Sequence, residues 1–235
     1  MKDLKFLKNG LIAHRGVHIS APENSISAFK EAIKKKYIIE LDVHLLKDNT
    51  VVVFHDDDLS RMIGKNIKLK NCTYEDIKNL KLLNTDNYIP TFEEVLKLIN
   101  GKVPIIVELK YDRRVGLLEK EVVKLLDNYK GKFCIQSFNP LSIKWFKKHK
   151  PEYIRGLLLN RKPKNIIDKL CHTSFVLYLT KPDFLSCNYK LSNNKKIIKY
   201  MKKNPVIAWT IRNDEELDKN KDSFYNLIVD FYKKD

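Results

Sequence analysis

Short apolar runs alternate with amphipathic segments along most of this 235-residue chain. Such alternation is typical of repeated β/α units, in which helices join parallel strands. The length is close to that of an eight-stranded barrel of this kind, so the expected fold class is a TIM-type (β/α)8 barrel. We expect strands near residues 11–14, 38–43, 51–55, 103–109, 133–137, 154–159, 184–187, 206–210 and 227–230. We expect helices near residues 24–35, 91–99, 116–128, 139–148, 163–171, 193–202 and 214–219.

The chain thus has one more predicted strand than an eight-stranded barrel needs. We therefore expect the barrel to be irregular around its second and third strands. We take residues 51–55 as the extra strand. Residues 57–90 also interrupt the alternation, and they include a short helix predicted at 73–80 with Thr73 as its cap. We expect this small insertion to lie over the barrel mouth, because loops there build active sites. Residues 1–235 are expected to form a single domain.

One short turn separates Asp42 from His55. If the dipeptide Asp48–Asn49 forms a two-residue hairpin turn, Asp42 faces His55 across the hairpin. Because strand side chains alternate between faces, Glu40, Asp42 and His55 then project to the same side. A parallel return would need a crossover of about a dozen residues, and only residues 44–50 are available. Two carboxylates and an imidazole on one face suit metal binding and proton transfer.

The chain carries 45 Lys and Arg residues against 29 Asp and Glu residues, a formal net charge of +16. Lysine is spread along the chain, which favours a solvated surface. The alternative is that the basic surface attracts anionic substrates. No helix-turn-helix, zinc-finger or RNA-recognition signature is present, so no nucleic-acid partner is expected. The sequence does not fix an oligomeric state.

The cysteines bear on the cellular compartment. They form no CxxC pair and favour reduced thiols over a disulfide framework or a zinc site. The chain shows no secretory signal and no apolar run of about 18 residues, so we expect a cytoplasmic protein without stable membrane insertion. The four cysteines are Cys72, Cys134, Cys171 and Cys187.

Several motifs follow one another in the order found in a known enzyme family. They are His14-Arg15-Gly16, Pro22-Glu23-Asn24-Ser25 with Ala28-Phe29, Glu40-x-Asp42, His55-Asp56 with Leu59 and Arg61, residues 89–96, Glu108-Leu109-Lys110, Gln136-Ser137-Phe138 and Trp209-Thr210. In these motifs the chain resembles the glycerophosphodiester phosphodiesterases over nearly its whole length. The resemblance implies a metal-dependent barrel enzyme of lipid and glycerol metabolism. It would hydrolyse small glycerophosphodiesters to sn-glycerol 3-phosphate and an alcohol.

Glu40, Asp42 and Glu108 are the predicted metal ligands. The segment 103–109 is apolar until Glu108, near the carboxyl end of a strand, where barrel active sites lie. Three oxygen donors without a Cys or His cluster favour Mg²⁺ or Ca²⁺ over zinc. The resemblance assigns the metal to the same three residues. For Glu40 alone, the alternative is a strand-end carboxylate that pairs with a lysine.

His14 and His55 are the predicted acid–base pair, because an imidazole can accept or donate a proton near neutral pH. Both fall in motifs of the resembling family, and the sequence does not decide which of them is the acid. His44 shares their face and is expected at the edge of the site. The other histidines are expected to be ordinary loop or helix residues: His18, His149 and His172.

Arg15 and Lys110 are predicted to bind the phosphate, since fixed cations stabilise the charge that develops on it in the transition state. Glu23 and Asn24 are expected behind them. They would orient Arg15 or the first helix, or contact substrate hydroxyls.

Phe138 and Trp209 end predicted strands and are expected to line the pocket against glycerol carbons, with core packing as the alternative. The resemblance implies that the glycerol 2-hydroxyl attacks first and gives a cyclic phosphate, which water then opens. Two other functions stay open. One is a related barrel phosphodiesterase acting on a lysophospholipid or a sphingolipid-type diester, and the other is a barrel that binds anions without catalysis.

Overall fold

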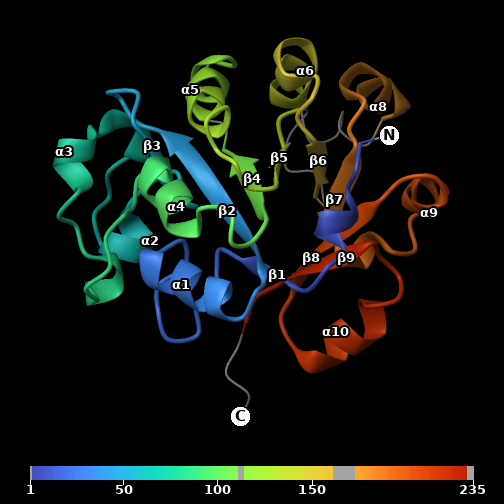
Figure 1. The fold of residues 1–235 in the computed structure, drawn as a ribbon, viewed down its shortest axis with the longest axis horizontal. Helices are drawn as coiled ribbons and strands as arrows, with labels where there is room; N and C mark the ends of the chain where they lie inside the picture. Colours follow the sequence, from blue (N-terminus) through green and yellow to red (C-terminus); the bar gives the residue numbers. More distant parts are fainter. Residues whose placement is uncertain (1, 111–113, 161–172, 232–235) are drawn as a thin grey trace.

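The computed structural model describes residues 2–110, 114–160 and 173–231. Within these residues all strands belong to one sheet, and all but β3 form a closed ring of parallel strands with helices outside it (Figure 1). The ring closes because β1 pairs with both β2 and β9. The predicted β/α barrel is therefore confirmed. Its strands are β1 (Ile12–His14), β2 (Ile38–Leu45), β4 (Ile105–Leu109), β5 (Phe133–Ser137), β6 (Arg155–Leu159), β7 (Phe184–Asn188), β8 (Val206–Ile211) and β9 (Asn226–Val229).

Helices cover the outside of the ring, and side-chain caps fix where several of them begin. The Ser25 hydroxyl accepts a hydrogen bond from the Ala28 N–H at 3.2 Å, and Thr91 forms a capping box with Glu94. No helix in the described ranges is long and apolar enough to cross a membrane. The outer helices are α1 (Ile26–Lys34), α4 (Phe92–Ile99), α5 (Leu117–Leu126), α6 (Pro140–His149), α8 (Ser174–Thr180), α9 (Lys195–Met201) and α10 (Asp214–Asn220). Short 3-10 helices span Lys5–Leu7, Leu69–Asn71, Leu82–Asn84 and Tyr189–Leu191.

One predicted helix is not tested by the structure, and one observed helix was not predicted. The helix predicted at 163–171 lies outside the described residues. The helix α8 occupies a stretch in which the sequence pattern predicted none.

An apolar layer fills the amino-terminal end of the ring. The N-terminal segment closes this end, because Leu4, Phe6 and Leu7 belong to the same cluster. Side chains two positions further along each strand face the interior again, at the carboxyl ends. Polar residues such as His14, after Ile12, therefore stand directly above apolar ones. The strand residues of the layer are Ile12, Ile38, Ile106, Cys134, Phe184, Ile207 and Ile228.

The strand β3 (Val51–Val53) pairs with β2 outside the ring, as predicted for the extra strand, but the predicted register was wrong. Val43 lies opposite Val53, and the Phe54 N–H donates to the carbonyl of Asp42 at 3.0 Å. The Leu46 N–H donates to the carbonyl of Thr50 at 2.9 Å, so the hairpin loop has three residues instead of two. Asn49 is left-handed with φ of 66°, whereas Asp48 does not have the positive φ that a two-residue type I′ turn would also require. His55 therefore lies one residue beyond the position opposite Asp42, in the loop after β3.

Residues 57–90 form the small insertion, which contains α2 (Ser60–Ile63) and α3 (Tyr74–Ile77) and lies at the left of Figure 1. The predicted short helix is present as α3, and Thr73 and Asp76 form its capping box. The insertion shares a separate hydrophobic core with the β2–β3 hairpin. That core consists of Leu46, Val52, Phe54, Leu59, Met62, Leu69, Cys72, Ile77, Leu82 and Ile89.

Only part of the insertion reaches the barrel mouth. Asp57, Asp58 and Lys68 border the cleft at the carboxyl ends of the strands. The hydrophobic core of the insertion lies beside the β2–β3 hairpin instead. The expectation that the insertion covers the mouth is thus met along one edge.

Candidate active site

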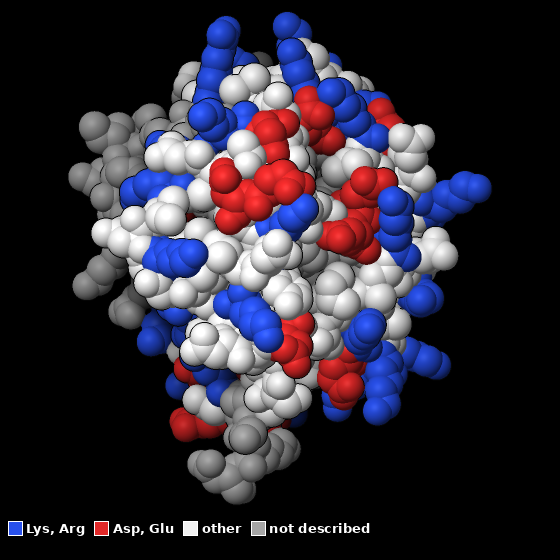
Figure 2. All heavy atoms as spheres, turned by 90° about the vertical axis from the view of Figure 1, so that its left-hand side faces the viewer, with Lys and Arg blue, Asp and Glu red and all other residues white. Residues whose placement is uncertain are grey.

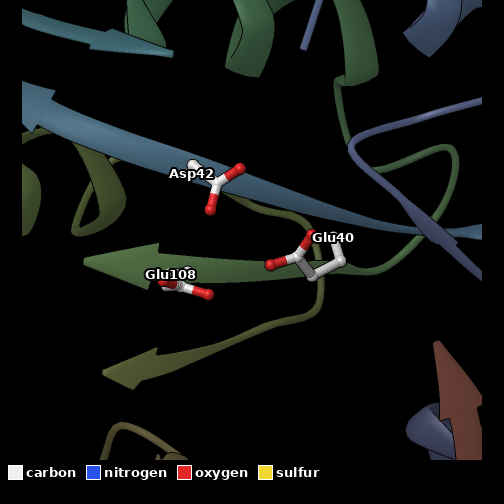
Figure 3. Close-up of side chains that lie close together, drawn as sticks. All are labelled: Glu40, Asp42 and Glu108. Atoms are coloured by element: carbon white, nitrogen blue, oxygen red, sulfur yellow. The ribbon is translucent and has the colours of Figure 1, made fainter. Parts of the chain in front are cut away.

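Three carboxylates converge from two neighbouring strands. Glu40 and Asp42 lie on β2, and the parallel register places Asp42 beside Glu108 on β4. One carboxylate oxygen from each side chain lies within 4.8 Å of the others, and Figure 3 shows the three side chains pointing toward one another. All three are buried. The structure therefore brings the three predicted metal ligands together.

Burial makes this cluster electrostatically costly without a cation. It raises the pKa of Glu40 well above its usual value, and the carboxylates of Asp42 and Glu108 raise it further. Burial likewise raises the pKa of Glu108, although the Lys110 ammonium opposes this. A divalent cation would offset the repulsion, and carboxylate oxygens are the ligands that Mg²⁺ and Ca²⁺ prefer. The donor set therefore fits such an ion.

Arg15 and Lys110 lie directly against the carboxylates. The Lys110 Nζ is 2.9 Å from Asp42 Oδ1 and 2.6 Å from Glu108 Oε1, while Arg15 Nε is 3.3 Å from Asp42 Oδ2. Burial would raise the pKa of Asp42, but these two cations hold it well below its usual range. Both predicted phosphate-binding residues thus border the predicted metal site, and both contact its carboxylates in this structure.

His14 ends β1 and lies against Asp230, which follows β9. The ring Nδ1 of His14 hydrogen-bonds to Asp230 Oδ1, and its Nε2 lies 4.0 Å from Glu40 Oε2. Burial lowers the pKa of His14, while the bond to Asp230 opposes the decrease. His18, expected to be an ordinary loop residue, places its Nε2 3.5 Å from the same Asp230 oxygen. Arg212 Nε lies 3.3 Å from the other carboxylate oxygen.

His55 has a carboxylate partner of its own in the loop after β3. Its Nδ1 lies 2.7 Å from Asp56 Oδ1, and the second Asp56 oxygen accepts a hydrogen bond from Arg61 Nε at 2.7 Å. Burial lowers the pKa of His55 to about 4, against the attraction of Asp42. At neutral pH the imidazole is therefore neutral and able to accept a proton.

Glu23 and Asn24 hold the cations and carboxylates in place. Glu23 binds Arg15 Nη1 at 2.7 Å and Arg61 Nη2 at 2.6 Å, which links the segment that follows His14 to the segment that follows His55. The Asn24 amide donates to Asp42 Oδ2 at 2.8 Å. Glu23 thus contacts Arg15 as expected, whereas Asn24 contacts a predicted metal ligand.

His44 does not line the cleft at the carboxyl ends of the strands. Its side chain is buried, and its Nε2 is 3.2 Å from the carbonyl oxygen of His55. The strand β2 continues past the barrel mouth and pairs there with β3. His44 lies in this paired part of β2, so the hairpin covers its side chain. His44 therefore contacts the backbone that carries His55.

Most of the predicted site residues border one cleft of about 650 Å³ at the carboxyl ends of the strands. Phe138 and Trp209 form its aromatic wall, with ring centroids 5.7 Å apart in an edge-to-face arrangement. Figure 2 looks at the side toward which β2 points in Figure 1, where acidic side chains gather near the centre with Lys and Arg around them. The predicted site residues among the cleft's lining are His14, Arg15, Glu40, His55, Glu108, Lys110, Phe138 and Trp209.

Several residues of the site had no predicted role. Asp56, Arg61 and Gln136 stand inside the quoted motifs, and Asp230 lies just after the last strand. Gln136 lines the cleft, and its side-chain amide lies 3.3 Å from Glu40 Oε1. The signal available in the sequence was adjacency: Asp56 follows His55, and Gln136 is two residues from Phe138. Asp230 carried no comparable local signal.

Comparison with known proteins bears on the family of the chain. The YhdW protein of Bacillus subtilis is 32% identical over 221 residues, a match that covers 87% of each chain. The glycerophosphodiester phosphodiesterase of Caldanaerobacter subterraneus is 35% identical over 164 residues, covering 65% of this chain and 67% of the relative. A phosphodiesterase of Oleispira antarctica, solved with the product sn-glycerol-3-phosphate, is 24% identical and has a TM-score of 0.78. That match covers 94% of this chain and 92% of the other, and it shows a shared fold.

The model of the glycerophosphoryl diester phosphodiesterase family matches residues 14–230. That range includes every residue that borders the cleft. It begins at His14 and ends at Asp230, the two partners that the closure of the barrel brings into contact. The chain therefore belongs to the glycerophosphoryl diester phosphodiesterase family.

Proposed function

We propose that this enzyme hydrolyses glycerophosphodiesters to sn-glycerol 3-phosphate and an alcohol, using a divalent metal ion and two histidines. The observation that carries the proposal is the convergence of Glu40, Asp42 and Glu108 within 4.8 Å, at a cleft that Glu40 and Glu108 border together with His14 and His55. The product bound to the Oleispira antarctica phosphodiesterase supports the assignment of sn-glycerol 3-phosphate.

Glu40, Asp42 and Glu108 would hold Mg²⁺ or Ca²⁺, and such an ion supplies positive charge that polarises a phosphate oxygen. Arg15 and Lys110 add fixed positive charge beside it. They stabilise the developing phosphate charge more than the ground state, since they are partly buried and positioned in advance.

The two histidines transfer protons in this proposal. Each has its Nδ1 against a carboxylate, Asp230 for His14 and Asp56 for His55. A carboxylate at this position keeps the proton on Nδ1, so Nε2 of the neutral ring accepts one. One imidazole, neutral at Nε2, takes the proton of the attacking glycerol 2-hydroxyl, and the other, which also carries a proton on Nε2, gives that proton to the leaving alcohol oxygen. Water then opens the resulting cyclic phosphate with the two roles reversed, which restores the starting protonation state of each ring.

Other parts of the structure support the remaining assignments. The edge-to-face pair Phe138 and Trp209 offers an apolar wall for the glycerol carbons. The family match over residues 14–230 supports one catalytic domain. Cys72, Cys134 and Cys187 are free thiols, which supports a reducing, cytoplasmic location.

Turnover of a substrate panel tests the proposal. The panel contains glycerophosphocholine, glycerophosphoethanolamine, glycerophosphoglycerol, a lysophospholipid and a sphingolipid-type diester, each with metal or with chelator. We expect sn-glycerol 3-phosphate from the glycerophosphodiesters only when metal is present. Release of the head-group alcohol from the lysophospholipid or the sphingolipid-type diester alone would favour the alternative substrate class. Turnover that resists the chelator would contradict the metal role.

A histidine variant tests the proton-transfer step. His55→Ala should lower kcat by roughly 10²–10⁴-fold and leave metal affinity unchanged. His149→Ala is the matched control, because that exposed histidine on α6 does not border the cleft. An equal loss of metal affinity in His55→Ala would show that the residue supports the metal site instead.

A further inference from the structure

Two neighbouring helices expose an unusual combination of side chains. Leu141 on α6 is 49% exposed, and Phe175 and Tyr178 on α8 are 69% and 73% exposed. Exposed lysines stand beside them on the same two helices. We call this set the α6–α8 surface, and it consists of Leu141, Lys144, Lys148, Phe175, Tyr178 and Lys181.

The two helices form one continuous face. They lie side by side in Figure 1, and the Lys147 ammonium on α6 donates to the carbonyl of Leu179 on α8 at 2.7 Å. On α8 the ammonium of Lys181 lies 5.8 Å from the centre of the Tyr178 ring. The apolar and basic side chains are thus held together by contacts between and within the helices.

This surface begins at the rim of the cleft. Phe138 and Asn139 line the cleft, and the Asn139 side chain accepts a hydrogen bond from the Leu141 N–H at 3.0 Å. Leu141 and Phe175 both lie in the first turn of their helices. Helices of a β/α barrel begin on the side where the active site opens. The exposed apolar side chains therefore stand on the active-site side of the molecule.

The charge of the surface is entirely positive. Residues 140–149 and 174–181 contain lysines but no Asp or Glu. The opposite rim of the cleft is different, because Asp56, Asp57 and Asp58 border it there. The chain as a whole has a net charge of +16, which strengthens attraction to an anionic partner.

We propose that the α6–α8 surface docks the enzyme on an anionic lipid bilayer, with the cleft opening beside the membrane. The exposed apolar tips would enter the boundary between headgroups and acyl chains, and the lysines would contact anionic headgroups. A second copy of the chain fits the surface less well, because a two-fold contact would bring identical lysines together. The docking is peripheral and does not depend on the proposed catalytic chemistry.

Vesicle sedimentation tests the proposal with the full chain. Vesicles of phosphatidylcholine alone are compared with vesicles that also contain phosphatidylglycerol. We expect binding to the anionic vesicles, loss of binding at high salt, and little binding to the neutral ones. Equal binding to both, or binding to neither, would overturn the proposal.

Two sets of variants assign the binding to this surface. The triple variants Leu141→Ser/Phe175→Ser/Tyr178→Ser and Lys144→Gln/Lys148→Gln/Lys181→Gln should each bind anionic vesicles at least tenfold more weakly. The matched controls are Ile198→Ser, on exposed α9, and Lys34→Gln/Lys35→Gln/Lys36→Gln, at the far end of α1. Equal losses in the controls would refute a localised surface.

Two further measurements separate bilayer docking from loss of the fold and from dimer formation. All of these variants should hydrolyse soluble glycerophosphodiesters at the wild-type rate, because none of the substituted residues borders the cleft. Circular dichroism checks that they fold. A wild-type dimer that the apolar triple variant converts to a monomer would mean that a second copy covers the surface, and the bilayer proposal would fail.

Discussion

The ring Nδ1 of His14 hydrogen-bonds to Asp230 Oδ1, although 216 positions separate the two residues in the sequence. His14 ends the first strand, and Asp230 follows the last one. Pairing of β1 with β9 closes the ring and brings them into contact. The orientation of a predicted catalytic imidazole therefore depends on closure of the barrel.

Asp230→Asn should lower kcat by roughly 10²–10⁴-fold, as expected when the carboxylate that fixes a histidine tautomer is lost. Metal affinity should be unchanged, because Asp230 is outside the carboxylate cluster. The comparison uses steady-state kinetics and metal titration of the two proteins. Asp218→Asn on the exposed side of α10 is the control. If Asp230→Asn keeps full kcat, the bond does not position the imidazole for catalysis.

Removing one carboxylate of the cluster should abolish metal binding. Mg²⁺ or Ca²⁺ should raise the Tm of the wild-type protein, with about 2.7 kcal/mol of stabilisation at roughly 100-fold excess over Kd. Glu108→Gln should lose this metal-dependent shift, while Glu93→Gln on the surface of α4 should keep it. Scanning fluorimetry with and without metal measures the effect. If Glu108→Gln keeps the metal-dependent rise in Tm, the metal binds elsewhere.

Acidification should destabilise the metal-free protein through His55. Its pKa is about 4 in the folded protein and about 6.5 when unfolded, so the unfolded state binds the proton preferentially between these values. The contribution of His55 to stability is thus lost as the pH falls from about 6.5 toward 4. Urea unfolding of wild type and His55→Gln across this window measures it. We expect the wild type to lose more stability, and parallel curves would contradict the low pKa.

Salt should separate long-range attraction from contact in the site. If surface lysines act by steering, higher ionic strength lowers kcat/KM for anionic diesters and leaves kcat nearly unchanged. Arg15→Ala and Lys110→Ala should lower kcat even at high salt, because both side chains are partly buried and directly contact the carboxylates. Arg15→Ala should be the more damaging, since guanidinium can bind two phosphate oxygens. If both variants keep the wild-type kcat, Arg15 and Lys110 do not act in the site.

A side chain at Gly156 should destabilise the barrel interior. A Cβ there would lie 2.3 Å from Cζ of the buried Phe184 ring on the adjacent strand. Gly156→Ala should therefore cost about 1–3 kcal/mol of unfolding free energy, measured by urea denaturation. Adding Phe184→Leu should recover part of that loss relative to Phe184→Leu alone. Strictly additive losses would show that the two side chains do not compete for space.

The sequence predicted the fold and most of the candidate site because local rules govern both. Short apolar runs marked the strands and helical patterns marked the helices, and Glu108 stood out as a charge at the end of an apolar strand. The hairpin register was wrong because turn length depends on whether Asp48 enters the left-handed region together with Asn49, and only Asn49 does so. His44 was placed at the edge because its face was predictable, whereas the hairpin that covers it is a tertiary feature.

The amino-acid sequence by itself determined which side chains face the barrel interior, since alternation along a strand is a local property. It also determined the oxygen-rich chemistry of Glu40, Asp42 and Glu108. Only the tertiary structure decided which of these groups touch: Asp230 with His14, and Lys110 with Asp42. Those contacts depend on strand register and ring closure, which join residues that are distant in the chain and carry no local signal of their pairing.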